Sequence, residues 1–333
     1  MNKEYNPLND SFLKENEYIF KKYKPVKRIG KGSFGNIYST VRIEDKSVFA
    51  MKTEKINNLK TLESEAYYLY LLQGFGIPKL ISFGHTKKYN ILIETLLDKS
   101  LHNIFCKNKK ICNIEDACLI AIQLLDRLEW IHSKNIVYRD VKPENFLIGI
   151  KDPNIIYVVD FGLSKKYRSS KTGKHILPRL TGRFNGTLLY ASPNAVRGKE
   201  SSRRDDIISL GYMLVYLIKR SLPWRKQFKG LTKMKYEETL YSKDSDGNGE
   251  LFKKIPQELI EYIKYAKNIK FEGDPDYQYL RSLFFNLLEK KNLNYRTLIF
   301  SWIGSDKKNK LSCIPKSNSK RKKSPFVKIL KNI

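Results

Sequence analysis

The sequence contains no long apolar run and little cysteine. No stretch approaches the roughly 18 consecutive apolar residues that a transmembrane helix needs, so we predict no membrane span. Residues 1–20 are polar and lack the apolar core of a signal peptide. The four cysteines form no C-x-x-C pair and no metal-ligand spacing with the four histidines; they are Cys106, Cys112, Cys118 and Cys313. This pattern is typical of thiols in a reducing compartment, so we expect a soluble chain in the cytoplasm, the nucleus or both.

Acidic residues are scarce beside basic ones: 34 Asp and Glu face 63 Lys and Arg, which gives a formal net charge of +29. A surplus of this size attracts acidic partners through long-range forces that salt weakens. The basic residues are spread along the chain without a known nucleic-acid-binding motif, so we expect no specific nucleic-acid partner. The apolar fraction of 41% in 333 residues suffices for one two-lobed domain or two ordinary ones.

The chain divides by pattern into a strand-rich part and a helical part. Alternating patterns predict one helix over 63–73 and strands over 23–29, 36–41, 46–52, 77–83 and 89–96. Helical spacing of apolar residues predicts helices over 113–133, 205–219, 257–269 and 277–290, the first capped by Asn113. After Gly304 the composition shifts to Lys, Ser and Asn, which is typical of a disordered tail. We therefore predict an extension over 1–22, a small lobe over 23–96, a larger helical lobe over 97–303 and a basic tail over 304–333.

The stretch from Tyr138 to Asn145 (YRDVKPEN) carries three polar groups suited to phosphate chemistry. Asp140 can accept a proton from an attacking hydroxyl, and Lys142 can neutralise a phosphoryl group during transfer. Asn145 can hold a metal ion that bridges phosphates. Fifteen residues later, Asp160 stands on a tight glycine turn after an apolar run and offers a carboxylate to the same metal. The two motifs in this order predict phosphoryl transfer.

A glycine-rich turn lies between the first two predicted strands. Gly30, Gly32 and Gly35 would let the backbone approach nucleotide phosphates, which a side chain would prevent. In a dinucleotide-binding fold such glycines would lead into a helix, whereas here they lead into a strand pattern. Seventeen residues after Gly35, Lys52 stands on the third predicted strand, from which it can reach the α- and β-phosphates. The set predicts a nucleotide site in the small lobe.

These motifs resemble those of protein kinases, with Tyr138 where most members have His. The order and spacing of further segments are similar to the casein kinase 1 family from about residue 23 to about residue 303. The segments are SKNIVYRDVKPENFLIG (133–149), NGTLLYASPN (185–194), GKESSRRDD (198–206), SLPW (221–224) and PDYQYLR (275–281). The first is closest to the gamma branch, which also has the Tyr. The resemblance implies an α+β, two-lobed kinase fold, with an antiparallel sheet and one main helix in the small lobe.

The resemblance further implies a Ser/Thr protein kinase that uses ATP and Mg²⁺. Asp140 would orient and deprotonate the substrate hydroxyl, Lys142 would contact the γ-phosphate, and Thr187 would hydrogen-bond beside them. Asn145 and Asp160 would bind Mg²⁺. We expect the enzyme to be a monomer.

Other residues would bind the nucleotide or support the site. Lys52 would be positioned by Glu65, which lies in the family's register, and Glu63 is the alternative. Asp206 would hold the backbone around Asp140 from below. The nucleotide-binding set implied by the resemblance is Ile29, Gly30, Gly32, Ser33, Phe34, Gly35, Ile37, Ala50, Lys52, Glu94, Leu96 and Leu147.

The hinge between the lobes departs from the family pattern. Counting from Tyr89 places Glu94 where the family has an apolar gatekeeper, with Thr95 as the first hinge residue. A one-residue insertion would instead make Ile93 the gatekeeper and Glu94 the hinge glutamate. A buried, unpaired Glu is costly, so we favour the insertion. In either register the adenine would meet backbone groups of residues 94–97.

Casein kinase 1 members favour Ser or Thr downstream of acidic or phosphorylated residues, and they use a basic anion site beside the cleft. The family Arg that precedes the tyrosine of the Gly-Thr turn is Leu189 here, and Lys226 replaces a glycine. Lys235 matches a family lysine, and Arg183 is near in sequence. We expect Arg183, Lys226 and Lys235 to keep a preference for acidic or phosphorylated protein substrates, with altered geometry. The alternative is a generally basic surface without a defined site.

Several other interpretations stay open. A pseudokinase scaffold would share the fold without the chemistry, and a vaccinia-related or tau-tubulin kinase would differ only in substrate. The segment 244–250 begins like a calcium loop, but its twelfth position would be Ile255, so we favour a solvated turn. The run 320–323 is either a nuclear-import or anionic-surface patch or a solvated end. The gamma branch carries lipid-modified cysteines near its C-terminus, but we do not extend membrane anchoring to Cys313.

Overall fold

A computed structural model describes residues 12, 17–31, 35–56, 61–228 and 233–303, apart from the side chains of 226–228, 233 and 234. Most of the predicted extension, the predicted tail, and Gly32, Ser33 and Phe34 lie outside the described residues. The chain forms two compact units, Met1–Phe300 and Ser301–Ile333, and the sheets and helices described below belong to the first. Within the described part, no helix has the length and apolar character needed to cross a membrane.

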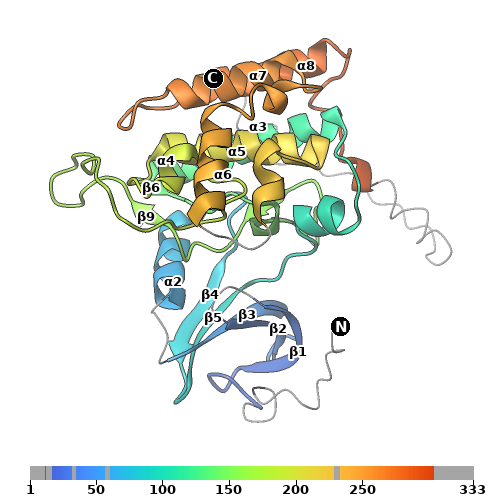
Figure 1. Cartoon of the computed structure of the whole chain (residues 1–333). Helices are drawn as coiled ribbons and strands as arrows, with labels where there is room; N and C mark the ends of the chain where they lie inside the picture. The colour runs from blue at the N-terminus through green and yellow to red at the C-terminus, as the bar shows by residue number, and fades with distance from the viewer. Residues whose placement is uncertain (1–11, 13–16, 32–34, 57–60, 229–232, 304–333) are drawn as a thin grey trace, which may run out of the picture. The chain divides into compact units, whose positions relative to one another are not determined.

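A five-stranded antiparallel sheet forms the N-terminal part, in the order β1-β2-β3-β5-β4 (Figure 1). Its strands are β1 (Tyr23–Lys31), β2 (Gly35–Arg42), β3 (Val48–Lys55), β4 (Leu80–His85) and β5 (Tyr89–Thr95). The helix α2 (Thr61–Leu72) connects β3 to β4 and packs beside the sheet. The predicted strands and helix of this part all exist, with ends shifted by a few residues.

The two faces of this sheet have different surroundings, because successive side chains in a strand point to opposite faces. On one face, Met51 of β3 and Ile93 of β5 are cross-strand partners within an apolar cluster of Phe12, Ile19, Tyr23, Tyr38, Met51, Ile91 and Ile93. The neighbouring pairs, Lys52 with Leu92 and Ala50 with Glu94, therefore lie on the other face. Phe12 and Ile19 precede the predicted domain boundary at residue 23, yet both are buried in this cluster.

The following residues form a mainly helical part. Its longer helices are α3 (Ile114–Ser133), α5 (Arg203–Lys219), α6 (Lys233–Asp244), α7 (Gln257–Asn268) and α8 (Tyr277–Glu289), with the short α4 (Pro193–Val196). Short helical segments that are not α-helices are η2 (His102–Lys107), η3 (Pro143–Asn145), η4 (Pro223–Phe228) and η5 (Glu250–Phe252). Two small ribbons pair β6 (Ile136–Val137) with β9 (Lys165–Lys166) and β7 (Phe146–Ile148) with β8 (Ile156–Val158). A sheet-rich part followed by a helical part confirms the predicted α+β, two-lobed class.

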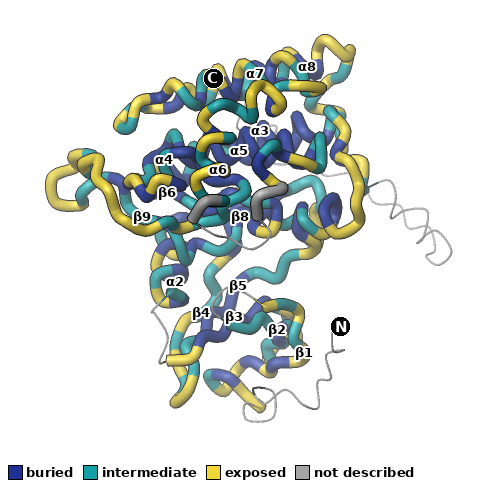
Figure 2. Tube along the Cα trace, in the orientation of Figure 1, coloured by how far each residue is buried: buried dark blue, intermediate teal, exposed yellow. Residues whose placement is uncertain are grey.

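The core of the helical part is built on α3 and α5, which Figure 2 colours mostly as buried. Asn113 caps α3, as the sequence predicts, because its side chain accepts from Asp116 N at 2.7 Å. At the start of α5, the side chain of Asp205 accepts from the backbone N–H of Ser202 at 2.8 Å. These caps satisfy backbone N–H groups that have no partner inside the helix.

The calcium-like segment forms a turn whose carboxylates are paired with cations. Asp246 accepts from Lys267 Nζ at 2.8 Å, and Asp244 and Glu250 pair with Arg197 and Lys253. The described cysteines, Cys106, Cys112 and Cys118, are free and buried.

Candidate active site

The segment 138–145, called the catalytic loop below, is held in place by a buried carboxylate of α5. Asp206 accepts from the backbone N–H of Tyr138 and of Arg139, each at 2.7 Å, which confirms the contact predicted for it. Its Oδ2 also lies 2.8 Å from Nε2 of His132, at the end of α3. Arg139 has a φ of 71°, a conformation that L residues adopt only when the surroundings enforce it. Asp206 therefore stabilises a strained backbone directly before Asp140.

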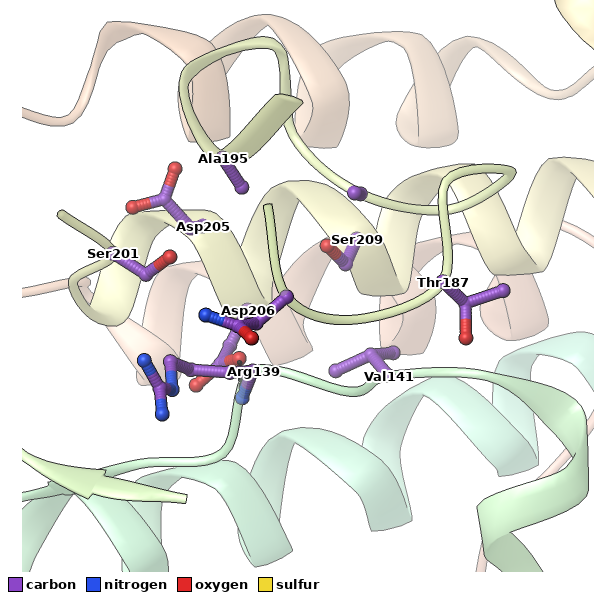
Figure 3. Close-up of a pocket in the computed structure, with 10 residues that line it drawn as sticks. Arg139, Val141, Thr187, Ala195, Ser201, Asp205, Asp206 and Ser209 are labelled. Carbon is purple, nitrogen blue, oxygen red and sulfur yellow. Dashed lines mark hydrogen bonds between the residues drawn. The ribbon is translucent and has the colours of Figure 1, made fainter. Parts of the chain in front are cut away.

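A small cavity lies between the catalytic loop, the segment around Thr187 and the start of α5 (Figure 3). Its volume of about 10 Å³ is enough for one water molecule. Arg139, Thr187, Asp205 and Asp206 are among the polar residues that line it. It is a packing gap beneath the loop rather than a substrate site.

Three side chains converge on Asp140, which is 4% exposed. Lys142 Nζ lies 2.5 Å from Asp140 Oδ2, and Asn145 Nδ2 donates to the same oxygen at 3.0 Å. Thr187 Oγ1 donates to the other oxygen, Oδ1, at 2.9 Å. The structure thus brings together four residues that the sequence placed up to 47 positions apart. A carboxylate fixed from both sides is suited to accept a proton from a hydroxyl placed beside it.

Tyr138 links the catalytic loop to the turn that carries Asp160. Its ring is fully buried, with Phe161 at 5.6 Å and Phe146 at 6.3 Å between ring centroids. Its hydroxyl donates to the backbone oxygen of Val159 at 2.6 Å. Asp160 itself has a φ of 63°, so this turn is also held away from the common backbone conformations.

A cavity of about 960 Å³ lies beside these groups and is lined by both the sheet and the helical part. Nine of the predicted nucleotide-binding residues line it: Ile29, Gly30, Gly35, Ile37, Ala50, Lys52, Glu94, Leu96 and Leu147. Asn145 and Asp160 line it too, so an amide and a carboxylate, ligand types that suit Mg²⁺, face one space. Among the described residues no group of three or more His, Cys, Asp or Glu is placed to hold a metal ion.

Thr95 and Leu97, which belong to the segment 94–97 predicted to meet the adenine, line the cavity, but the sequence did not predict other parts of the lining, including Ile150 and Val159. Ile150 and Val159 carry no motif, and only the folded chain brings them to the cavity. At Gly35, an added Cβ would lie 1.6 Å from Thr53 O, so the close pairing of β2 with β3 requires glycine there.

Lys52 has two acidic partners. Its Nζ lies 2.6 Å from Glu65 of α2, the partner predicted first, and 3.0 Å from Glu94 of β5. Glu94 is 3% exposed and directly opposite Ala50, so its side chain lies on the face that carries Lys52. Ile93 points to the opposite face. The favoured insertion is therefore wrong: Glu94 occupies the gatekeeper position, and its burial is tolerated because its carboxylate is paired with Lys52.

The charges around Lys52 are unbalanced. Burial lowers the pKa of Lys52, but the negative charges of Glu65, Glu94 and Asp160 outweigh it and raise that pKa above its ordinary value. Burial raises the pKa of Glu65 to about 7, with the charges of Asp160 and Glu94 adding to the rise and that of Lys52 opposing it. The raised pKa of Lys52 and the raised pKa of Glu65 have one cause, an excess of carboxylates: the Lys52 ammonium stays charged, but a single positive charge cannot neutralise three carboxylates.

The structure describes only part of the predicted anion site. Arg183 lies in an exposed segment, 177–183, and Lys235 lies partly buried on α6. The side chain of Lys226 lies outside the described residues. Leu189 offers its backbone oxygen to Trp224 Nε1 at 2.8 Å and to the buried Lys243 Nζ at 3.2 Å. The anion site stays a prediction.

A comparison with protein-family models found a match over residues 23–285 to the model described as protein kinase domain. The matched range begins at β1 and ends within α8. It includes Lys52, Glu65, the catalytic loop and Asp160.

Proposed function

The chain belongs to the protein kinase family, and we propose on this premise that it transfers the γ-phosphate of ATP to Ser or Thr hydroxyls of acidic or already phosphorylated proteins. The observation that carries the proposal is the convergence of Lys142, Asn145 and Thr187 on the Asp140 carboxylate. This cluster borders the cavity that also contains Lys52 and Asp160. The Ser/Thr and acidic preferences are supported by the similarity to casein kinase 1.

Each residue of the site would have a separate role in phosphoryl transfer. Asp140 would accept the proton of the substrate hydroxyl, and Lys142 would stabilise the charge of the phosphoryl group in transfer. Lys52, held on β3, would bind the inner phosphates. Asn145 and Asp160 would hold Mg²⁺, which supplies further neutralisation of phosphate charge when bound. The chemistry mainly requires positioned charges, which these residue types supply.

A peptide panel with Mg²⁺ and ATP tests this proposal. Matched peptides would offer Ser, Thr or Tyr, preceded by Ala, by Asp or by phosphoserine. We expect incorporation into Ser and Thr, with acidic or phosphorylated residues raising kcat/KM by about tenfold or more. Phosphorylation of Tyr alone, or no gain from acidic residues, would contradict the Ser/Thr or the acidic part of the proposal.

Substitutions of basic residues test which side chains give the preference for acidic substrates. Arg183→Ala and Lys235→Ala should reduce the gain from acidic residues while leaving the rate with neutral peptides nearly the same. Lys264→Ala is the matched control, because Lys264 is an exposed lysine on α7. An equal effect of all three substitutions would favour a generally basic surface over a defined site.

A further inference from the structure

Glu94 is an acidic residue in a wall built from the sheet. It pairs with Ala50 across β3 and β5, and both residues line the large cavity. The strand β5 is hydrogen-bonded on both sides, to β3 and to β4, so the backbone of Glu94 is fixed. Glu65, in contrast, reaches Lys52 from the helix α2, which packs on the sheet through side chains. Lys52 is therefore held from two independent elements.

Both ion pairs of Lys52, with Glu65 and with Glu94, are short and shielded from solvent. The side chains of Lys52, Glu65 and Glu94 are 13%, 6% and 4% exposed. An ammonium has three hydrogen-bond donors, so two can serve the carboxylates and one is left for a phosphate oxygen. Removing the partner of a buried charge is costly when no other partner remains. Here the loss of either carboxylate would leave Lys52 with the other.

We propose that Glu94 is a second positioning residue for Lys52, so that the placement of this lysine in the nucleotide site does not depend on Glu65 and α2 alone. The inference rests on the proposed function, since it assumes that Lys52 binds nucleotide phosphates. The second oxygen of Glu94 is buried without a hydrogen-bond partner among the described residues. Glu94 thus carries a desolvation cost that a residue filling space would not, and its contact with Lys52 is the compensation visible in the structure.

A double-mutant cycle tests the proposal. The affinity for a non-hydrolysable ATP analogue with Mg²⁺ would be measured by calorimetry for the wild-type chain, Glu65→Gln, Glu94→Gln and the double variant. Glutamine keeps the size of each side chain, and thermal unfolding verifies that all four proteins are folded. Repulsion between Glu94 and the phosphates acts in both backgrounds and cancels in the cycle.

If Glu94 shares the anchoring of Lys52, adding Glu94→Gln to Glu65→Gln should weaken nucleotide binding about tenfold more than adding it to the wild type. Glu54→Gln is the matched control, because Glu54 is a buried carboxylate of β3 that contacts Thr61 and Asn90. Its effect should be the same in both backgrounds within about twofold.

Equal effects of Glu94→Gln in the two backgrounds would overturn the inference and leave the proposed function intact. The same holds if Glu54→Gln shows as much coupling as Glu94→Gln, because the coupling would then reflect the packing of α2. A wild-type chain that does not bind the nucleotide would overturn both the inference and the proposed function.

Discussion

At the scale of single residues, Tyr138 shows how a departure from the common kinase pattern is accommodated. Where most family members have His, this Tyr extends its hydroxyl to Val159 O at 2.6 Å and fills the space beside Phe161. Tyr262 makes a similar bond away from the site, from its hydroxyl to Ile207 O at 3.0 Å. Both rings are fully buried. Comparing Tyr138 with Tyr262 therefore separates the effect of a buried hydroxyl on stability from its effect on catalysis.

Tyr138→Phe should lower the free energy of unfolding by about 1–2 kcal/mol, because a buried carbonyl loses its donor. It should also lower kcat, because the hydroxyl ties the catalytic loop to the turn that carries Asp160. Tyr262→Phe should lower stability by a similar amount without changing kcat. Urea unfolding and steady-state kinetics of both variants measure this, and equal kcat values for the two would refute the role of Tyr138.

The stability of the chain should depend on pH through Glu65. Its pKa in the folded chain is raised from 4.5 to about 7, so the folded chain binds the Glu65 proton more tightly than the unfolded chain does. The contribution of this tighter proton binding to the free energy of unfolding is fully present below pH 4.5 and is lost as pH rises through about 7. The wild type should therefore lose stability relative to Glu65→Gln between these values, by on the order of 1–3 kcal/mol. Urea unfolding of both proteins across this range measures the difference. A difference that is constant with pH, or that grows in favour of the wild type, would contradict it.

At the scale of elements, the start of α5 connects helix capping to the active site. Asp205 caps the helix by accepting from Ser202 N at 2.8 Å, and the next residue, Asp206, accepts from the backbone of Tyr138 and Arg139. Two neighbouring carboxylates thus serve different elements. One fixes where the helix begins, and the other fixes the loop that carries Asp140.

Asp206→Asn should reduce kcat by about tenfold or more, since a neutral amide holds the strained backbone at Arg139 less firmly than a carboxylate. Its free energy of unfolding should fall by about 2 kcal/mol. Asp205→Asn should cost similar stability with a much smaller change in kcat. A variant Asp206→Asn with wild-type kcat would show that α5 does not support the catalytic loop.

The elements differ in how well the sequence predicts them. The helix predicted over 113–133 is found at Ile114–Ser133, because a polar cap and regular apolar spacing mark it from within. The strand predicted from residue 77 begins at Leu80, since Ile77 is apolar and buried but belongs to the preceding loop. The gatekeeper could not be assigned correctly, because the partner that makes a buried Glu94 acceptable lies on another strand. Local sequence patterns carry no information on contacts between different strands and helices.

At the scale of the whole molecule, the fold class follows from the order of strand and helix patterns, and the candidate site follows from motifs whose spacing the kinase fold explains. The contact of Thr187 with Asp140 spans 47 residues, so local patterns could not predict it; it was expected only through the family resemblance, and the structure confirms it. The excess of positive charge, +29, suits acidic partners, but charge alone does not define a site. The acidic residues that matter most are the few buried ones around Lys52 and the catalytic loop.

The proposed function requires that this site transfers phosphate from ATP with Asp140 as the proton acceptor. The most direct test measures the transfer of labelled phosphate from ATP, with Mg²⁺, to casein by the wild type and by Asp140→Ala, with nucleotide binding and thermal unfolding of both as controls. We predict transfer by the wild type and a loss of about 100-fold or more in the variant, with folding and nucleotide binding retained. Equal transfer by the two proteins, or a folded wild type that binds ATP and transfers no phosphate to casein or to any peptide of the panel, would contradict the proposed function.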